Sequence, residues 1–187
     1  MTVQKNWTIK LVLLKGTSMQ FGNLHRLAPE LRVETWIGSD GKELIRPLKL
    51  ADLGDGYKII FCFQHWCPGC HSRGFPTLKK LHSSLKSKNV GFAVIQTVFE
   101  GEDVNTVEKL RLNQEQYFLK MPFGHDVVQD GDQYPSFMAD YRTAGTPWFT
   151  VIDPSGAVVF ADFRLDADRL LEALGEESVD MHRVPDS

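Results

Sequence analysis

Two cysteines separated by two residues are the side chains of this sequence most able to do chemistry. Cys67 and Cys70 lie in "FQHWCPGCHSRGFP", residues 63–76. A strand that ends near Gln64 and a helix that begins near Pro68 would place Cys67 at the helix N-terminus, where proline is well tolerated. Unpaired backbone N–H groups and the helix dipole favour a thiolate there. Cys70 falls three residues later on the same helix face, within disulfide reach but less exposed. We therefore expect Cys67 to attack and Cys70 to resolve.

Metal binding is the first alternative use of this motif. One Cys-x-x-Cys supplies two ligands, whereas a structural zinc site needs four. The sequence has only three cysteines, and Cys62 lies in an apolar run, where it is best interpreted as a small buried residue. His65 and His71 are too near in sequence to complete a relaxed tetrahedron. We therefore expect no metal and no other cofactor.

Proton transfer is a second possible task for the residues around the cysteines. His65 and His71 flank the motif, and histidine titrates near neutral pH. Either ring could carry protons to or from the thiols. The competing interpretation is that both are ordinary surface histidines, and the sequence leaves the two interpretations open.

Composition limits the class of protein. The 187 residues, 42% apolar and 24% charged, are typical of one globular domain. The opening apolar run is short and broken by Lys10, without a cleavage site, so we expect a cytoplasmic protein. The net charge is −3 and the basic residues lack the density of a binding stripe, so we expect neither nucleic acid nor membrane as a partner.

The order of predicted elements indicates an α/β fold. Alternation in "LRVETWI", followed by the turn "GSDG", predicts a hairpin. Strand–helix–strand units then require parallel strands, and a late strand pair around "DPSG" adds antiparallel ones. The predicted elements are strands at 57–63, 90–99, 147–153 and 157–163, a helix after the cysteines interrupted at Pro76, an amphipathic stretch at 103–120, a loop-like segment at 121–145 with one short strand and one helical turn, and a last helix capped by Asp166 and stopped by Gly175.

With these elements in place, the sequence resembles the thioredoxin superfamily. The resemblance rests on "WCPGC" after an apolar strand and on the later "GTPWFTVIDPSG". The leading hairpin and the insertion at about 100–142 resemble TlpA-like thiol-disulfide reductases and their redoxin (AhpC/TSA-related) relatives. The resemblance implies a three-layer α/β/α fold with a central mixed sheet, an N-terminal hairpin extension and a helix-containing insertion. The domain boundaries we expect are an extension at 1–27, the domain at 28–174 and an acidic, flexible tail at 175–187.

The resemblance also implies roles for individual residues. Pro147 would be a cis-proline facing the cysteines, and the backbone of Thr146 would pair with an extended substrate. Trp66, Pro68 and Gly69 would complete the substrate surface. The implied activity is thiol-disulfide exchange on a protein or small-molecule disulfide, supplied with electrons by a dithiol or thioredoxin-type donor.

Three departures from the family pattern leave the proton acceptor and the redox direction open. Phe61 occupies the strand position where thioredoxins carry a buried acid. Arg73 and Gly74 stand where TlpA-like reductases often have a glutamate. The Pro-Gly dipeptide between the cysteines reverses the thioredoxin order and also occurs in more oxidising relatives.

Two further functions compete with disulfide exchange. A peroxiredoxin-like thiol peroxidase would need proline and threonine or serine at defined positions before Cys67, where this chain has Phe61 and Gln64. A non-enzymatic module would use the groove at Thr146 and Pro147 to hold a peptide, helped by aromatic residues. The aromatic residues in question are Trp66, Trp148 and Phe149.

Overall fold

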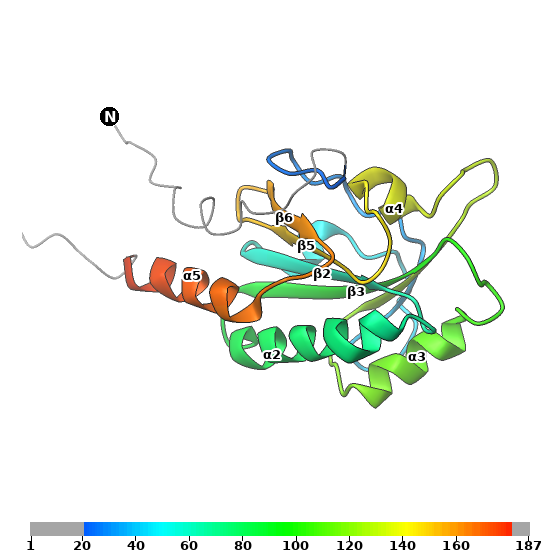
Figure 1. Ribbon diagram of the computed structural model, residues 1–187, viewed down its shortest axis with the longest axis horizontal. Coiled ribbons are helices and arrows are strands. Elements are labelled where there is room, and N and C mark those ends of the chain that lie inside the picture. Colours follow the sequence, from blue (N-terminus) through cyan, green and yellow to red (C-terminus); the bar gives the residue numbers. More distant parts are fainter. Residues whose placement is uncertain (1–20, 181–187) are drawn as a thin grey trace, which may run out of the picture.

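The computed structural model describes residues 21–180, with the side chains of 176–180 left aside. The expectations for residues 1–20 and 181–187, which make up most of the predicted extension and tail, fall outside this range. Within it, six strands form one mixed sheet in the order β1-β4-β3-β2-β5-β6. Four α-helices accompany the sheet in the described part of the chain (Figure 1). The predicted α/β class with a central mixed sheet is confirmed.

The centre of the sheet carries the residues that lead into the cysteine motif. Strand β2 (Tyr57–Phe63) pairs in parallel with β3 (Val90–Val98) and antiparallel with β5 (Trp148–Ile152). The late strand pair is completed by β6 (Val158–Asp162), antiparallel to β5. Because β2 is an interior strand with a neighbour on each side, the loop that follows it is held at the centre of the sheet, at the ends of the strands.

Side chains of β2 alternate between two hydrophobic cores. Ile59, Phe61 and Phe63 pack in the core under the helices α2 (Phe75–Leu85) and α5 (Ala167–Asp180). Ile60 and Cys62 pack in the core on the opposite face. Figure 1 shows α2, α3 and α5 on one side of the sheet and α4 on the other, so the layers follow α/β/α order.

The predicted hairpin near the start of the domain is present but short. The chain reverses after β1 (Thr35–Ile37) and returns with a single bridge between Ile37 and Glu43. The main partner of β1 is instead β4 (Phe123–Val127), which runs antiparallel to it from the predicted insertion. The insertion therefore extends the sheet rather than lying outside it.

The other elements of the insertion are two helices with polar caps. Helix α3 (Val107–Gln116) is shorter than the predicted stretch at 103–120, because Thr106 caps it and accepts the N–H of Lys109 at 3.3 Å. Helix α4 (Ser136–Tyr141) begins where the buried carboxylate of Asp126 accepts the backbone N–H groups of residues 136 and 137 at 3.0 and 2.8 Å. Capping of this kind satisfies backbone donors that a helix end leaves free.

The helix after the cysteines is interrupted as predicted, and the interruption is a π-helical turn. Residues 68 and 69 begin the helix, Cys70–Gly74 form the π segment, and α2 continues it. Pro76 has no N–H to donate to the preceding turn. The N–H of Phe75 reaches the carbonyl of Cys70, one residue further back than in an α-helix. We call residues 68–85 the motif helix.

The last helix corrects one prediction. Asp166 caps it by accepting the N–H groups of residues 168 and 169 at 3.1 and 3.2 Å, as expected. Gly175 does not stop it, because α5 runs on to Asp180. Glycine in a helix interior costs only about 1 kcal/mol relative to alanine, which the burial of Leu170 and Leu174 outweighs. The first residues of the predicted tail are therefore helical.

Two observations complete the outline of the domain. Residues 25–28, which straddle the predicted start of the domain, pair with the chain near the start of β6, with the N–H of Ala28 donating to Gly156 at 2.8 Å. No helix within residues 21–180 has the length and apolar character needed to cross a membrane.

Candidate active site

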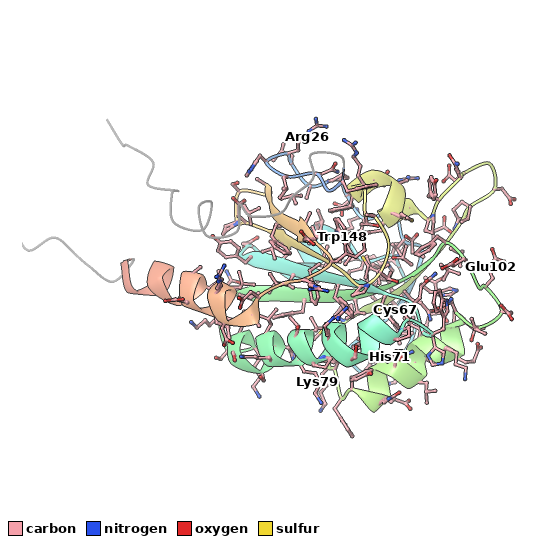
Figure 2. The ribbon with its side chains drawn as sticks, in the orientation of Figure 1. Arg26, Cys67, His71, Lys79, Glu102 and Trp148 are labelled. Carbon is pink, nitrogen blue, oxygen red and sulfur yellow. A yellow bond between two sulfur atoms is a disulfide. The ribbon has the colours of Figure 1, made fainter. Side chains whose placement is uncertain are left out.

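Cys67 and Cys70 lie where β2 gives way to the motif helix. The N–H of Cys67 donates to the carbonyl of Gln64 at 3.1 Å, which closes a turn, and helical backbone starts at Pro68. The two cysteines form a disulfide with their Cα atoms 5.3 Å apart. Figure 2 places Cys67 between the sheet and the first turn of this helix. The predicted strand–turn–helix context of the motif is confirmed.

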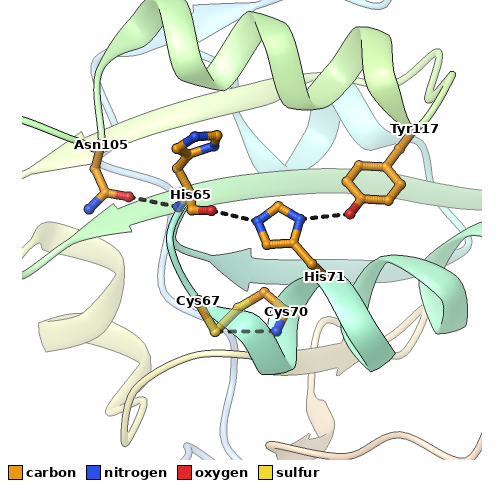
Figure 3. The surroundings of a disulfide bond; sticks show 6 residues. All are labelled: His65, Cys67, Cys70, His71, Asn105 and Tyr117. Carbon is orange, nitrogen blue, oxygen red and sulfur yellow. Dashed lines mark hydrogen bonds between the residues drawn. A yellow bond between two sulfur atoms is a disulfide. The ribbon is translucent and has the colours of Figure 1, made fainter.

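The two sulfur atoms differ in their access to solvent. Cys67 keeps 6% of its surface exposed, whereas Cys70 is completely buried. The sulfur of Cys67 accepts the backbone N–H of Cys70 at 3.2 Å (Figure 3). This N–H belongs to the first turn of the helix and is shared with the carbonyl oxygen of Cys67 at 3.1 Å. Donors at a helix N-terminus stabilise negative charge. The geometry therefore suits a thiolate at Cys67 rather than at Cys70.

A cis-proline lies against the helix beside the disulfide. The peptide bond between Thr146 and Pro147 is cis. A Cβ atom placed on Gly69 would lie 3.4 Å from Cδ of Pro147, and one placed on Gly74 would lie 3.3 Å from its Cβ. The same Cβ on Gly74 would lie 2.5 Å from Cζ of Phe61. Close approach of the helix to Pro147 and the strand below therefore depends on glycine at position 74.

A cleft of about 680 Å³ opens over these residues. It includes Cys67 and all five residues predicted to contact substrate, and it excludes Cys70, His65 and His71. Sequence reasoning missed the charged groups that share the cleft, because they come from three separate segments. The predicted residues in the cleft are Trp66, Cys67, Pro68, Gly69, Thr146 and Pro147, and the charged ones are Arg73, Glu100, Asp162 and Arg164.

The place of the family's buried acid is filled by aromatic packing. Phe61 is fully buried, with its ring stacked on Phe149 at a centroid distance of 4.7 Å and edge-on to Phe75 at 5.1 Å. Phe149 is therefore core rather than peptide-binding surface. Gln64 lies in the turn after this strand, and its buried Oε1 atom has no hydrogen-bond partner among the described residues. Position 61 itself therefore offers no titratable group.

His71 joins two parts of the site instead of facing the disulfide (Figure 3). Its Nε2 atom lies 2.5 Å from the carbonyl oxygen of His65, and its Nδ1 atom lies 2.6 Å from the hydroxyl of Tyr117. A carbonyl can only accept, so Nε2 carries the proton in the neutral ring and Nδ1 accepts from Tyr117. Burial raises the pKa of Tyr117, which keeps this donor protonated.

His65 is held from the insertion in the same way. Its backbone N–H donates to Oδ1 of Asn105 at 2.7 Å, and the side-chain amide of Asn113 donates to its Nδ1 at 2.9 Å. Burial lowers the pKa of His65, and the charge of Lys109 adds to the effect, which favours the neutral ring. Asn105, Asn113 and Tyr117 were not predicted, because no local motif marks contacts that span forty or more residues.

A metal centre receives no support from the geometry. Within residues 21–180, no three side chains of histidine, cysteine, aspartate or glutamate are grouped so that they could hold a metal ion. Both sulfur atoms of the motif are engaged with each other.

Comparison with known proteins gives the family. No protein-family model matches the chain, and no curated protein matches it. Among solved structures, a thioredoxin-like superfamily protein is 30% identical, with a TM-score of 0.69 over 84% of this chain and 97% of its own. A thiol-disulfide isomerase from Corynebacterium glutamicum is also 30% identical, with a TM-score of 0.66 over 80% and 95%.

A more distant structure shares the fold. The thioredoxin domain of a thiol-disulfide oxidoreductase from Bacteroides vulgatus is 19% identical, with a TM-score of 0.60 over 82% of this chain and 96% of its own. Identity of 30% across nearly the whole of two relatives, together with the Cys-x-x-Cys disulfide beside a cis-proline, places this chain in the thioredoxin superfamily.

Proposed function

We propose that the protein is a thiol-disulfide oxidoreductase that uses Cys67 and Cys70 as its dithiol and disulfide. The observation that supports this most directly is the arrangement of the pair. The disulfide spans a helix start, only Cys67 reaches the surface, and that surface is a cleft bordered by cis-Pro147. The coarser assignment to redox chemistry is supported by relatives described as thiol-disulfide isomerases and oxidoreductases.

The exchange follows from the difference between the two sulfurs. The Cys67 thiolate attacks one sulfur of a substrate disulfide, that bond breaks, and the released thiolate takes a proton from solvent. Cys70 then loses its proton and attacks the sulfur of Cys67 in the mixed disulfide. The second substrate thiol leaves, two electrons have passed to the substrate, and the Cys67–Cys70 disulfide remains. A dithiol donor of thioredoxin type restores the reduced pair, and the same steps in reverse oxidise a dithiol.

We assign His65 and His71 to positioning rather than to proton transfer. In each neutral ring, the nitrogen that could accept a proton already accepts a hydrogen bond, from Asn113 in His65 and from Tyr117 in His71. The bonds of His71 and Asn105 to residue 65 hold the turn that carries Cys67. Since Phe61 offers no acceptor beside Cys70, the proton of Cys70 passes to the substrate thiolate that leaves in the second step.

A redox titration of the Cys67–Cys70 pair in glutathione or dithiothreitol buffers tests the function. Trp66 fluorescence and intact mass would report the state of the pair. A potential near about −270 mV would group the protein with reductants, and one above roughly −180 mV with oxidases or isomerases. Cys67→Ser should abolish exchange, and Cys70→Ser should accumulate a mixed disulfide. The proposal would be overturned if the pair formed no reversible disulfide at any buffer potential, or if Cys67→Ser exchanged disulfides at the wild-type rate.

The two competing functions have less support. A peroxidase needs a hydrogen-bonding threonine or serine before the reactive cysteine, and this chain has the amide of Gln64 there. A pure peptide-binding module accounts for the 48% exposure of Trp66, but it gives no role to the paired sulfurs. Peptide binding without exchange is the result expected if the titration fails.

A further inference from the structure

Arg73 lines the cleft into which Cys67 opens. It follows Cys70 by three residues on the motif helix. Its Nη2 atom lies 3.5 Å from where a Cβ of Gly69 would stand, and that same point lies 3.4 Å from Cδ of Pro147. The guanidinium group is thus placed over the dipeptide between the two cysteines, on the side of the cis-proline.

This guanidinium group has no partner within residues 21–180. Arg32 and Arg46 each make two hydrogen bonds to a carboxylate, at 2.7–2.9 Å from Asp140 and 2.7–2.8 Å from Asp52. Arg73 forms neither an ion pair nor a side-chain hydrogen bond with any described residue. An arginine offers five N–H donors in a plane that matches a carboxylate. A free one beside a reactive sulfur is available to a substrate.

Neither of the two carboxylates that line the cleft forms an ion pair with Arg73. Glu100 follows β3 and so lies on one side of β2, whereas Asp162 and Arg164 come from the end of β6, on the other side. Asp162 and Arg164 have opposite charges and offset each other. The sequence has no acidic residue between Gly56 and Phe99. The positive charge of Arg73 on the Pro147 side is therefore not neutralised by an ion pair with either carboxylate of the cleft.

We propose that Arg73 selects substrates whose disulfide-bonded cysteine is flanked by an acidic residue. This inference rests on the proposed function. The substrate peptide lies in the cleft beside Pro147, and the carboxylate next to its cysteine accepts hydrogen bonds from the Arg73 guanidinium group. Charge-assisted, two-pronged pairs of this kind are stronger than neutral hydrogen bonds. Arg73 is a specificity residue here, and the sulfur chemistry stays with the cysteines.

Three cystine peptides that differ only in the residue after cysteine, Glu, Gln or Lys, test this inference. The reduced enzyme is mixed with each peptide, and the second-order rate of its oxidation is followed by tryptophan fluorescence. Wild type should react with the Glu peptide about fivefold faster than with the Gln peptide, and slowest with the Lys peptide. Arg73→Gln should bring the three rates together, and Arg73→Glu should reverse their order.

Lys79→Gln is the matched control, because Lys79 lies on the same helix but points away from the cleft (Figure 2). It should keep the wild-type order of rates. Equal rates for the three peptides in wild type, or an unchanged ratio in Arg73→Gln even if all rates fall together, would overturn the inference. Failure of the proposed function looks different, since wild type would then oxidise with none of the peptides.

Discussion

Three cysteines within nine residues meet three different environments, although their side chains are chemically identical. Cys67 reaches the cleft, whereas Cys70 is buried in the hydrophobic core between the motif helix and the sheet. Cys62 projects from β2 into the core on the opposite face of the sheet. The sequence was sufficient to predict these environments, because alternation along a strand and spacing along a helix are local properties. It did not identify Arg73 as a cleft residue, because its place there depends on Pro147, which lies more than seventy residues away in the sequence.

Cys62 should be inert in the folded protein. Burial raises the pKa of its thiol far above the usual range, and its side chain has no exposed surface. After reduction, iodoacetamide at neutral pH should label Cys67 quickly, while Cys62 stays unmodified in the native state and is labelled in guanidinium chloride. Mass spectrometry of the digested protein measures each site. Labelling of native Cys62 at the rate of Cys67 would contradict its buried placement.

Among the elements, the motif helix and α5 show which features of a helix local sequence patterns predict and which they do not. Pro76 predicted an interruption, but the π-helical form of the interruption depends on the approach of Gly74 to Phe61 and Pro147. Gly175 predicted a helix end that does not exist, because packing of Leu170 and Leu174 overrides local propensity. The insertion was predicted as a segment, whereas its hydrogen bonds to the cysteine turn were not, since they join residues distant in sequence.

The link between α3 and the motif helix predicts a stability effect for Tyr117→Phe. The change removes the hydroxyl that donates to His71 at 2.6 Å and keeps the ring stacked on Phe75 at a centroid distance of 3.9 Å. The free energy of unfolding should fall by about 0.5–1.5 kcal/mol, the net value of one hydrogen bond. Urea unfolding measures it. Tyr134→Phe is the control, because Tyr134 is 45% exposed and forms no hydrogen bond with the described residues. Equal effects of the two substitutions would refute the link.

At the scale of the whole molecule, burial of imidazole rings couples folding to pH. Burial is the main cause that lowers the pKa of His65, His82 and His125, so these rings resist protonation in the folded chain. In the unfolded chain they take up protons near the ordinary value of about 6.5. The unfolded state therefore binds more protons below that pH, and stability must fall as the pH falls. Burial raises the pKa of Asp126, so its contribution has the opposite sign and is confined to the more acidic carboxyl range.

We therefore expect the free energy of unfolding to be lower at pH 5.5 than at pH 7.5 by about 1 kcal/mol, since all three rings keep part of their surface in solvent. Urea unfolding of the oxidised protein at both pH values measures the difference. His125→Gln should reduce this pH difference, because it removes one of the three imidazole rings. Glutamine is chosen because its amide can still donate to Oε1 of Gln96, which lies 2.9 Å from Nδ1 of His125. The difference between the two pH values is the diagnostic quantity, whatever the variant does to absolute stability. Stability that rises on acidification from pH 7.5 to 5.5, or a His125→Gln variant with a larger pH difference than wild type, would show that these rings are not protected from protonation by the fold.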